Sequence, residues 1–327
     1  MTTAMIRNEA GKIQNQILFG GSLIERFIRF AGVSEKSAST YKTALRQLAK
    51  YFAANAITAP TREDLEMWRD GLIADEKSPA TVQLYLTSCK LFFKWTAQEN
   101  LYPNIADNMK AKVKINHEHK KDALSAAQAG NLIKNVQCIS ARKQKRNGLL
   151  EKRARAILAV MASCALRCIE VSRLDVADMI HEFGRTYLLV QGKGHSMKDA
   201  KVLLPAQVEA LIRDYLQARG NVADNQPLFT STANRNRGSR LSTQTISKMV
   251  KAQLRAAGLN TPRLTAHSLR HTAATTMILA GCDLTQVQQV LRHVSIVTTQ
   301  IYNNAVERMK NTAEQTAANA IFDTICA

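Results

Sequence analysis

The chain has 327 residues, of which 46% are hydrophobic and 22% are charged. This balance is ordinary for a globular protein, so wholesale disorder is excluded, and the length predicts about two domains. Its 45 Lys and Arg residues outnumber its 26 Asp and Glu residues, which gives a formal net charge of +19. A charge of this sign and size indicates a polyanionic partner, most commonly nucleic acid. The alternative is a charge that only keeps the protein soluble.

The sequence gives no support for a membrane, metal or nucleotide partner. It has no run of about 18 apolar residues and no secretory signal at its start, so we expect a cytoplasmic protein. The 6 cysteines form no CxxC pair and no zinc spacing with the 7 histidines, and we interpret them as reduced thiols. Glycine-rich nucleotide loops, EF-hand loops and carboxylate clusters are absent, so we expect no cofactor.

The first third of the chain has a helical pattern. Residues 1–20 lack periodicity, and we expect a loose arm there. Residues 21–109 carry apolar faces at helical spacing, and two helix starts are marked clearly. Thr61 and Asp64 form a capping-box pattern, and Ser78 precedes Pro79 as an N-cap precedes proline at the first helical position. Short helices in under 100 residues predict a compact helical domain.

A polar, basic stretch at residues 110–122 predicts an interdomain linker before a second domain at residues 123–327. Residues 1–120 hold 17 basic and 12 acidic side chains, and the remainder holds 28 and 14. Both parts are therefore basic, at +5 and +14. Two basic domains joined by a linker predict a two-domain, C-shaped clamp around a rod-shaped polyanion.

The second domain is predicted to be mixed. Helical patterns cover residues 123–137 and 150–165, and an apolar helix is expected to contain Arg167. Two β-rich segments, at 185–191 and 201–205, flank a Gly192-Lys193-Gly194 turn. Helices dominate from residue 206, ending in an amphipathic tail at 306–327. We therefore expect a mainly α fold with a small antiparallel β-sheet in this domain.

Residues 265–304 carry the chemical signal. His267 and Arg270 are three positions apart, hence on one helix face, and His293 follows a predicted helix at 284–291. Tyr302 comes nine positions after His293. A lone histidine or tyrosine means little, but phosphate-binding donors beside a hydroxyl nucleophile, in a basic protein, favour phosphodiester chemistry.

These motifs resemble those of the tyrosine recombinase (phage integrase) family, in its Xer/Cre-like form without an arm-binding domain. The family pattern H-x-x-R, L-G-H and Tyr is present as His267-Ser-Leu-Arg270, Leu291-Arg-His293 and Tyr302. The upstream T-G-x-R-x-x-E-L becomes Cys164-Ala-Leu-Arg167-Cys-Ile-Glu170-Val, and the hairpin G-K-G becomes Gly192-Lys193-Gly194. The helical first domain is similar to the family's SAM-like core-binding domain, so the resemblance covers roughly residues 20–325.

The resemblance implies a site-specific recombinase that cuts and rejoins duplex DNA without metal or ATP. It implies a covalent 3′-phosphotyrosyl intermediate, a Holliday junction, and a homotetramer on two inverted-repeat core sites, with DNA-bending proteins as possible accessories. The alternatives are relaxation of DNA like a type IB topoisomerase, or a non-catalytic DNA-binding relative. The complete catalytic set argues against the second: Arg167, Lys193, His267, Arg270, His293 and Tyr302.

The roles follow from charge and pKa. Two guanidiniums, Arg167 and Arg270, can each bind nonbridging phosphate oxygens, worth about 3–4 kcal/mol per well-placed donor. The free phenol of Tyr302 has a pKa of about 10, so it needs a base or cations, and His267 suits proton transfer. His293 would donate to the phosphate. Lys193 would protonate the leaving 5′ oxygen, with Lys198 or Lys201 as alternatives, and Glu170 would orient Arg167 or His267.

Other basic residues are candidates for contact with the DNA backbone, and a solvated charged face is the less favoured alternative. Residues 42–50 or 81–90 are the candidate helices for reading bases. The tail would pack on a neighbouring protomer, as the resemblance implies, or on its own domain. The DNA-binding candidates are Lys42, Arg46, Arg142, Lys143, Lys145 and Arg146.

The chain departs from the family pattern at three places. Cys164-Ala165 replaces Thr-Gly, Val171 replaces leucine, and Arg292 replaces the glycine before His293. Alanine fits if the backbone at residue 165 does not need a positive φ. Arg292 adds a charge that we expect to contact DNA or solvent.

Overall fold

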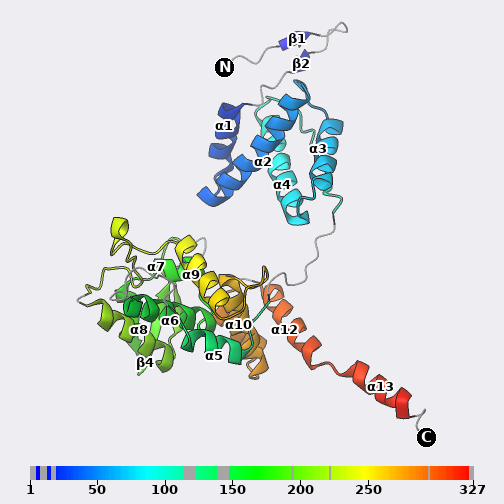
Figure 1. Cartoon of the computed structure of the whole chain (residues 1–327). Coiled ribbons are helices and arrows are strands. Elements are labelled where there is room, and N and C mark those ends of the chain that lie inside the picture. The colour runs from blue at the N-terminus through cyan, green and yellow to red at the C-terminus, as the bar shows by residue number, and fades with distance from the viewer. Residues whose placement is uncertain are drawn as a thin grey trace. The chain divides into compact units, whose positions relative to one another are not determined.

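The computed structural model describes residues 5–7, 13–15, 20–113, 122–137, 147–192, 195–220, 222–293 and 295–323. The chain divides into two compact units, Met1–His117 and Glu118–Ala327, which are described separately (Figure 1). Five predicted site residues lie outside the described ranges: Arg142, Lys143, Lys145, Arg146 and Lys193. Within those ranges, every helix is too short or too polar to cross a membrane.

The first unit is helical from residue 21 onward. Its helices are α1 (Gly21–Ala31), α2 (Glu35–Ala54), α3 (Arg62–Ala74) and α4 (Pro79–Gln98). The capping box of Thr61 and Asp64 is confirmed at the start of α3, and Ser78 caps α4 with Pro79 at its first turn. Within the expected loose arm, β1 (Met5–Arg7) and β2 (Ile13–Asn15) pair antiparallel.

Aromatic side chains fill the core of this unit. Phe27 of α1 packs edge-on against Phe92 of α4, at 5.5 Å between ring centroids. Trp95 lies 5.7 Å from Phe27, and all three rings are at most 2% exposed. Such rings contribute apolar burial together with a specific packing geometry, so they fix how α1 meets α4.

The second unit confirms the predicted fold class, mainly helical with a small antiparallel sheet. The buried helix α6 (Asn147–Ser163) packs against α8 (Ala206–Arg219) and α10 (Ala266–Leu279). The other elements in chain order are α5 (Ala126–Lys134), α7 (Cys168–Arg173), η2 (Val176–Asp178), β3 (Met179–Glu182), β4 (Arg185–Val190), β5 (Ala200–Leu203), η3 (Asn234–Asn236), α9 (Thr243–Ala256), α11 (Leu284–Leu291), α12 (Ile296–Lys310) and α13 (Ala313–Asp323).

The sheet has one strand more than the sequence predicted. Its order is β3-β4-β5, and both neighbouring pairs are antiparallel. The extra strand β3 joins β4 through Phe183 and Gly184, whose φ angles are 48° and 72°. Two consecutive positive φ angles are what a tight hairpin turn requires.

The predicted tail helix is divided in two. Helix α12 contains Tyr302 and ends at Lys310, and α13 begins at Ala313 with no buried residue. Asn311 caps α12 in an extended conformation, with φ −71° and ψ 120°, which ends the helical path. The amphipathic pattern therefore spans two elements rather than one.

Candidate active site

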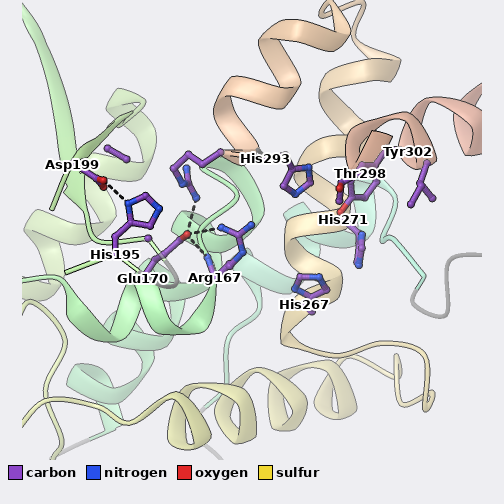
Figure 2. A pocket seen from close by; sticks show the side chains of 13 residues that line it. Arg167, Glu170, His195, Asp199, His267, His271, His293, Thr298 and Tyr302 are labelled. Atoms are coloured by element: carbon purple, nitrogen blue, oxygen red, sulfur yellow. Dashed lines mark hydrogen bonds and ion pairs between the residues drawn. The ribbon is translucent and has the colours of Figure 1, made fainter. Parts of the chain in front are cut away.

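Side chains from four parts of the second unit line a pocket of about 480 Å³ (Figure 2). They come from the start of α7, the β4–β5 connection, α10, and the segment from α11 into α12. Four predicted catalytic residues are among them, while Arg270 lies behind the lining and Lys193 is outside the described residues. The lining residues are Arg167, Glu170, Gly192, His195, Asp199, Ala200, His267, His271, Arg292, His293, Thr298, Ile301 and Tyr302.

Arg167 stands at a helix start and not inside an apolar helix, contrary to the prediction. Helix α6 ends at Ser163, and Arg167 is the extended N-cap of α7, at φ −79° and ψ 155°. Its backbone N–H donates to Glu170 Oε2 at 2.7 Å, and its Nη1 donates to Glu170 Oε1 at 2.7 Å. The buried carboxylate therefore fixes both the backbone and the guanidinium of Arg167.

Arg270 connects the segment between α6 and α7 to the end of α11. Its side chain is 1% exposed, and Nη1 donates to the carbonyl of Ala165 at 2.6 Å while Nη2 donates to that of Leu291. Burial, followed by repulsion from Arg167 and Arg292, lowers the pKa of Arg270 to about 9. The guanidinium is thus still charged at neutral pH, directly behind the pocket.

His293 is held as a neutral ring. Burial first, and then the charges of Arg270 and Arg167, lower its pKa to about 4. Its Nδ1 lies 3.0 Å from the hydroxyl of Thr299, which is 0% exposed. When this hydroxyl donates to Nδ1, the proton resides on Nε2, which can then donate to an anion. Thr299 was missed at the sequence level, although its place three residues before Tyr302 puts it on the same helix.

Tyr302 is buried at 4% exposure on α12. Its ring lies 5.1 Å from that of His271 and 6.3 Å from that of His293. Burial raises the pKa of the phenol despite the opposing charges of Arg270 and Arg167. His271 is 5% exposed, and its ring also lies 4.6 Å from that of His267. The ring of Tyr302 therefore lies beside two histidines, His271 and His293 (Figure 2).

The connection after β4 is anchored at its first residue. Arg173 Nη1 on α7 donates to the carbonyl of Gly192 at 3.0 Å. His195, missed at the sequence level, lines the pocket, and its Nδ1 lies 2.5 Å from Asp199 Oδ2. These contacts hold both sides of the predicted Gly192-Lys193-Gly194 turn.

The two alternative proton donors are engaged elsewhere. Lys198 Nζ bonds to Asp175 at 2.7 Å and to Asp178 at 2.5 Å. Burial opposes the charged form of Lys198, but these carboxylates outweigh it and raise the pKa. Lys201 Nζ bonds to Glu182 on the sheet at 2.7 Å. Neither lysine is among the residues that line the pocket.

The two replaced glycine positions both have left-handed backbones. Ala165 has φ 55° and Arg292 has φ 53°, so the condition under which alanine replaces glycine without backbone strain is not met at residue 165. The Arg292 side chain is 14% exposed and pairs with Glu170 at 2.7 Å. In the unbound chain the guanidinium of Arg292 is therefore paired with Glu170, a contact that the sequence did not predict.

Two family models match the chain. The phage integrase family model matches residues 124–309, and the phage integrase N-terminal SAM-like domain matches residues 23–102. The chain belongs to the phage integrase family. This family comprises the tyrosine recombinases, so the chain is an enzyme of the site-specific DNA recombinase type.

Relatives of this chain and solved structures support the same family. Tyrosine recombinase XerC of Corynebacterium glutamicum is 30% identical over 243 residues, covering 73% of this chain and 72% of that protein. Tyrosine recombinase XerD of Proteus mirabilis is 29% identical over 290 residues, covering 85% and 86%. The fold is similar to that of the XerH recombinase in a post-cleavage complex with difH, with a TM-score of 0.70, 23% identity, and coverage of 92% and 84%. A lambda integrase dimer bound to a core site has a TM-score of 0.62 at 18% identity, covering 85% and 96%. These relatives favour recombination over the topoisomerase alternative.

Proposed function

We propose that Tyr302 is the nucleophile with which this family member cleaves DNA. Its phenolic oxygen attacks the scissile phosphorus, and the bond from phosphorus to the 5′ oxygen breaks. The products are a 3′-phosphotyrosyl bond and a free 5′-hydroxyl. Repeating the exchange on a second duplex gives a Holliday junction. The observation that carries the proposal is the convergence of Arg167, His293 and Tyr302 on one pocket.

The remaining groups have roles suited to their surroundings. Arg167 and Arg270 offset the charge that develops on the phosphorane, and neutral His293 donates to a nonbridging oxygen. The raised pKa of Tyr302 means that a base must take its proton. We assign this role to His267. Because the ring of His271 lies close to both Tyr302 and His267, the proton passes to His267 through His271, which takes one proton from the phenol and gives one up to His267. Lys193 delivers the proton to the 5′ oxygen. The engagement of Lys198 and Lys201 with carboxylates supports this assignment.

DNA binding rests on the basic surface. Arg46 on α2 is exposed, whereas Lys42 on the same helix pairs with Glu25 at 2.7 Å. We assign both to backbone contacts, with Arg142, Lys143, Lys145 and Arg146 in the same role, and the two units to the two arms of a clamp. The substrate is an inverted-repeat core site, and the active form is a homotetramer, with DNA-bending proteins as accessories. The exposed Ile321 and Phe322 of α13 support a tail that docks on a neighbouring protomer.

The test begins by finding the DNA site. The purified chain is incubated with sheared genomic DNA from the organism that encodes it, and covalent adducts are recovered under denaturing conditions and sequenced. A substrate built on the recovered site, with a nick next to the cleavage position, then traps the intermediate. We expect an adduct with the wild-type chain and none with Tyr302→Phe. Absence of any adduct, or its persistence in Tyr302→Phe, would refute the assignment.

A further inference from the structure

Arg292 occupies a position that a glycine fills in the family pattern. It follows α11 with φ 53° and ψ 45°, and the N–H of His293 reaches back to the carbonyl of Gln288 at 3.2 Å. A helix that closes in this way favours glycine, because a left-handed conformation strains any residue with a Cβ. A strained arginine beside a reaction centre is retained only where its surroundings hold it, which points to a function for its side chain.

The side chain of Arg292 is among those that line the pocket. Its Nη2 bonds to Glu170 Oε2 at 2.7 Å and lies 3.4 Å from the carbonyl of Ala165. Its Nη1 donates to the carbonyl of Val290 at 2.6 Å. Of the three guanidiniums gathered on Glu170, those of Arg167 and Arg292 line the pocket, and that of Arg270 does not.

We propose that Arg292 binds the scissile phosphate, as a second pocket-lining guanidinium beside Arg167. This inference rests on the proposed function, and it names a phosphate ligand that the family motif does not contain. Arg270 lies behind the lining in the unbound chain, where its Nη atoms donate to the carbonyls of Ala165 and Leu291. When the phosphate enters, Nη2 of Arg292 turns from Glu170 to a nonbridging oxygen.

The charge balance around Glu170 is consistent with this exchange. One carboxylate faces three guanidiniums, so two positive charges are left over for an anion. Glu170 keeps two hydrogen bonds from Arg167 after Arg292 departs, so its buried carboxylate does not lose all its partners. A phosphorane carries more negative charge than the phosphodiester, so the surplus favours the transition state over the bound substrate.

The rival interpretation is that Arg292 only braces the turn that carries His293. A substrate with a methylphosphonate at the scissile position separates the two, because a methyl group replaces a charged nonbridging oxygen. Removing a residue that offsets charge slows cleavage of this neutral substrate less than cleavage of the phosphodiester. Removing a residue that only supports the turn slows cleavage of both substrates equally. The probe is the nicked site described above, in phosphodiester and methylphosphonate forms.

We expect Arg292→Gly to slow single-turnover cleavage of the phosphodiester by about 10²–10³-fold. On the methylphosphonate substrate, the cleavage rate of Arg292→Gly should be less than about tenfold below that of the wild-type chain. Glycine accepts the left-handed backbone, so this variant leaves the turn intact. The matched control is Arg213→Gln, which removes an exposed arginine paired with Glu209 on α8 and should cleave both substrates at the wild-type rate.

Unchanged cleavage of the phosphodiester by Arg292→Gly, or equal losses on both substrates, would overturn the inference. If Arg292→Gly does not fold, Arg292→Lys is compared on the same two substrates and judged by the same ratio. The proposed function fails in a different way, since the wild-type chain itself would then form no adduct.

Discussion

Glu170 is paired with three arginines at the pocket, Arg167, Arg270 and Arg292. It is 0% exposed and accepts from the backbone N–H of Arg167 and from the guanidiniums of Arg167 and Arg292. Burial alone would raise its pKa, but Arg292 and the hydrogen bonds from Arg167 outweigh burial and lower it. The carboxylate is therefore ionised at neutral pH.

We expect Glu170→Gln to destabilise the second unit by about 3–5 kcal/mol, because it leaves guanidiniums facing one another without a counter-charge. Urea unfolding followed by circular dichroism measures this. Glu170→Asp, which keeps the charge on a shorter side chain, is the control and should lose less. An unfolding free energy of Glu170→Gln within about 1 kcal/mol of wild type would show that the three arginines do not need the carboxylate.

His293 gives a prediction about pH. Its pKa is lowered to about 4 in the folded chain, against about 6.5 when unfolded. Between these values the unfolded chain binds more protons, so the free energy of unfolding decreases as the pH falls from about 6.5 toward 4. We expect His293→Gln to remove part of this decrease. Urea midpoints measured from pH 7 to 4.5 check it, and parallel curves for the two chains would contradict it.

At the scale of elements, short-range chemistry made some boundaries predictable. The capping residues Thr61 and Ser78 mark the starts of α3 and α4. These starts could be predicted because the side chains that accept hydrogen bonds from the free N–H groups belong to residue types that the sequence shows directly. The helix before His293 also ends as predicted, at Leu291. The motif spacing brought Arg167, His267, His293 and Tyr302 to one pocket.

What was missed depends on tertiary structure. Strand β3 has four residues and no strong pattern of its own, and its pairing with β4 defines it. The positive φ angles at Ala165 and Arg292 follow from loop closure around Arg270, and neither residue signals them. The ring contact of His271 with Tyr302 likewise needs α10 and α12 to be packed together.

Helix α7 links the pocket to the connection between β4 and β5. It begins after Arg167, contains Glu170, and ends with Arg173, which donates to the carbonyl of Gly192 at 3.0 Å. The helix therefore connects Arg167, the proposed phosphate ligand, to Gly192, the residue before Lys193.

We expect Arg173→Met, which keeps most of the apolar stem, to slow cleavage by roughly tenfold, equivalent to about 1.4 kcal/mol in the barrier. DNA affinity should be unchanged, and the unfolding free energy should change by only about 1 kcal/mol, the net value of one hydrogen bond. Trapping rates on the nicked substrate, beside gel-shift titrations, measure the two effects. A matching loss of affinity would mean that Arg173 contacts DNA and does not position the turn.

For the whole molecule, the net charge of +19 has at least two uses. A few cations, Arg167, Arg270 and Arg292, surround one carboxylate at the pocket. Most of the excess is distributed over both parts of the chain, at +5 in residues 1–120 and +14 in residues 121–327. Charge spread in this way suits many weak contacts with a phosphate backbone, whose combined strength depends on the release of counterions.

The logarithm of the DNA-binding constant should therefore decrease linearly with the logarithm of the salt concentration. Removing a single charge that contacts a phosphate should change the slope measurably. We expect Arg46→Gln to make the slope shallower by about 1, because each phosphate contact contributes about −0.9. Lys42 is paired with Glu25, so Lys42→Gln should change the slope less, since its ion pair must be broken before it can meet a phosphate. Tyr302→Phe, which changes no charge, should leave both slope and affinity intact while abolishing the covalent adduct. Fluorescence anisotropy from 50 to 300 mM salt measures these slopes, and an unchanged slope in Arg46→Gln would remove α2 from the DNA interface.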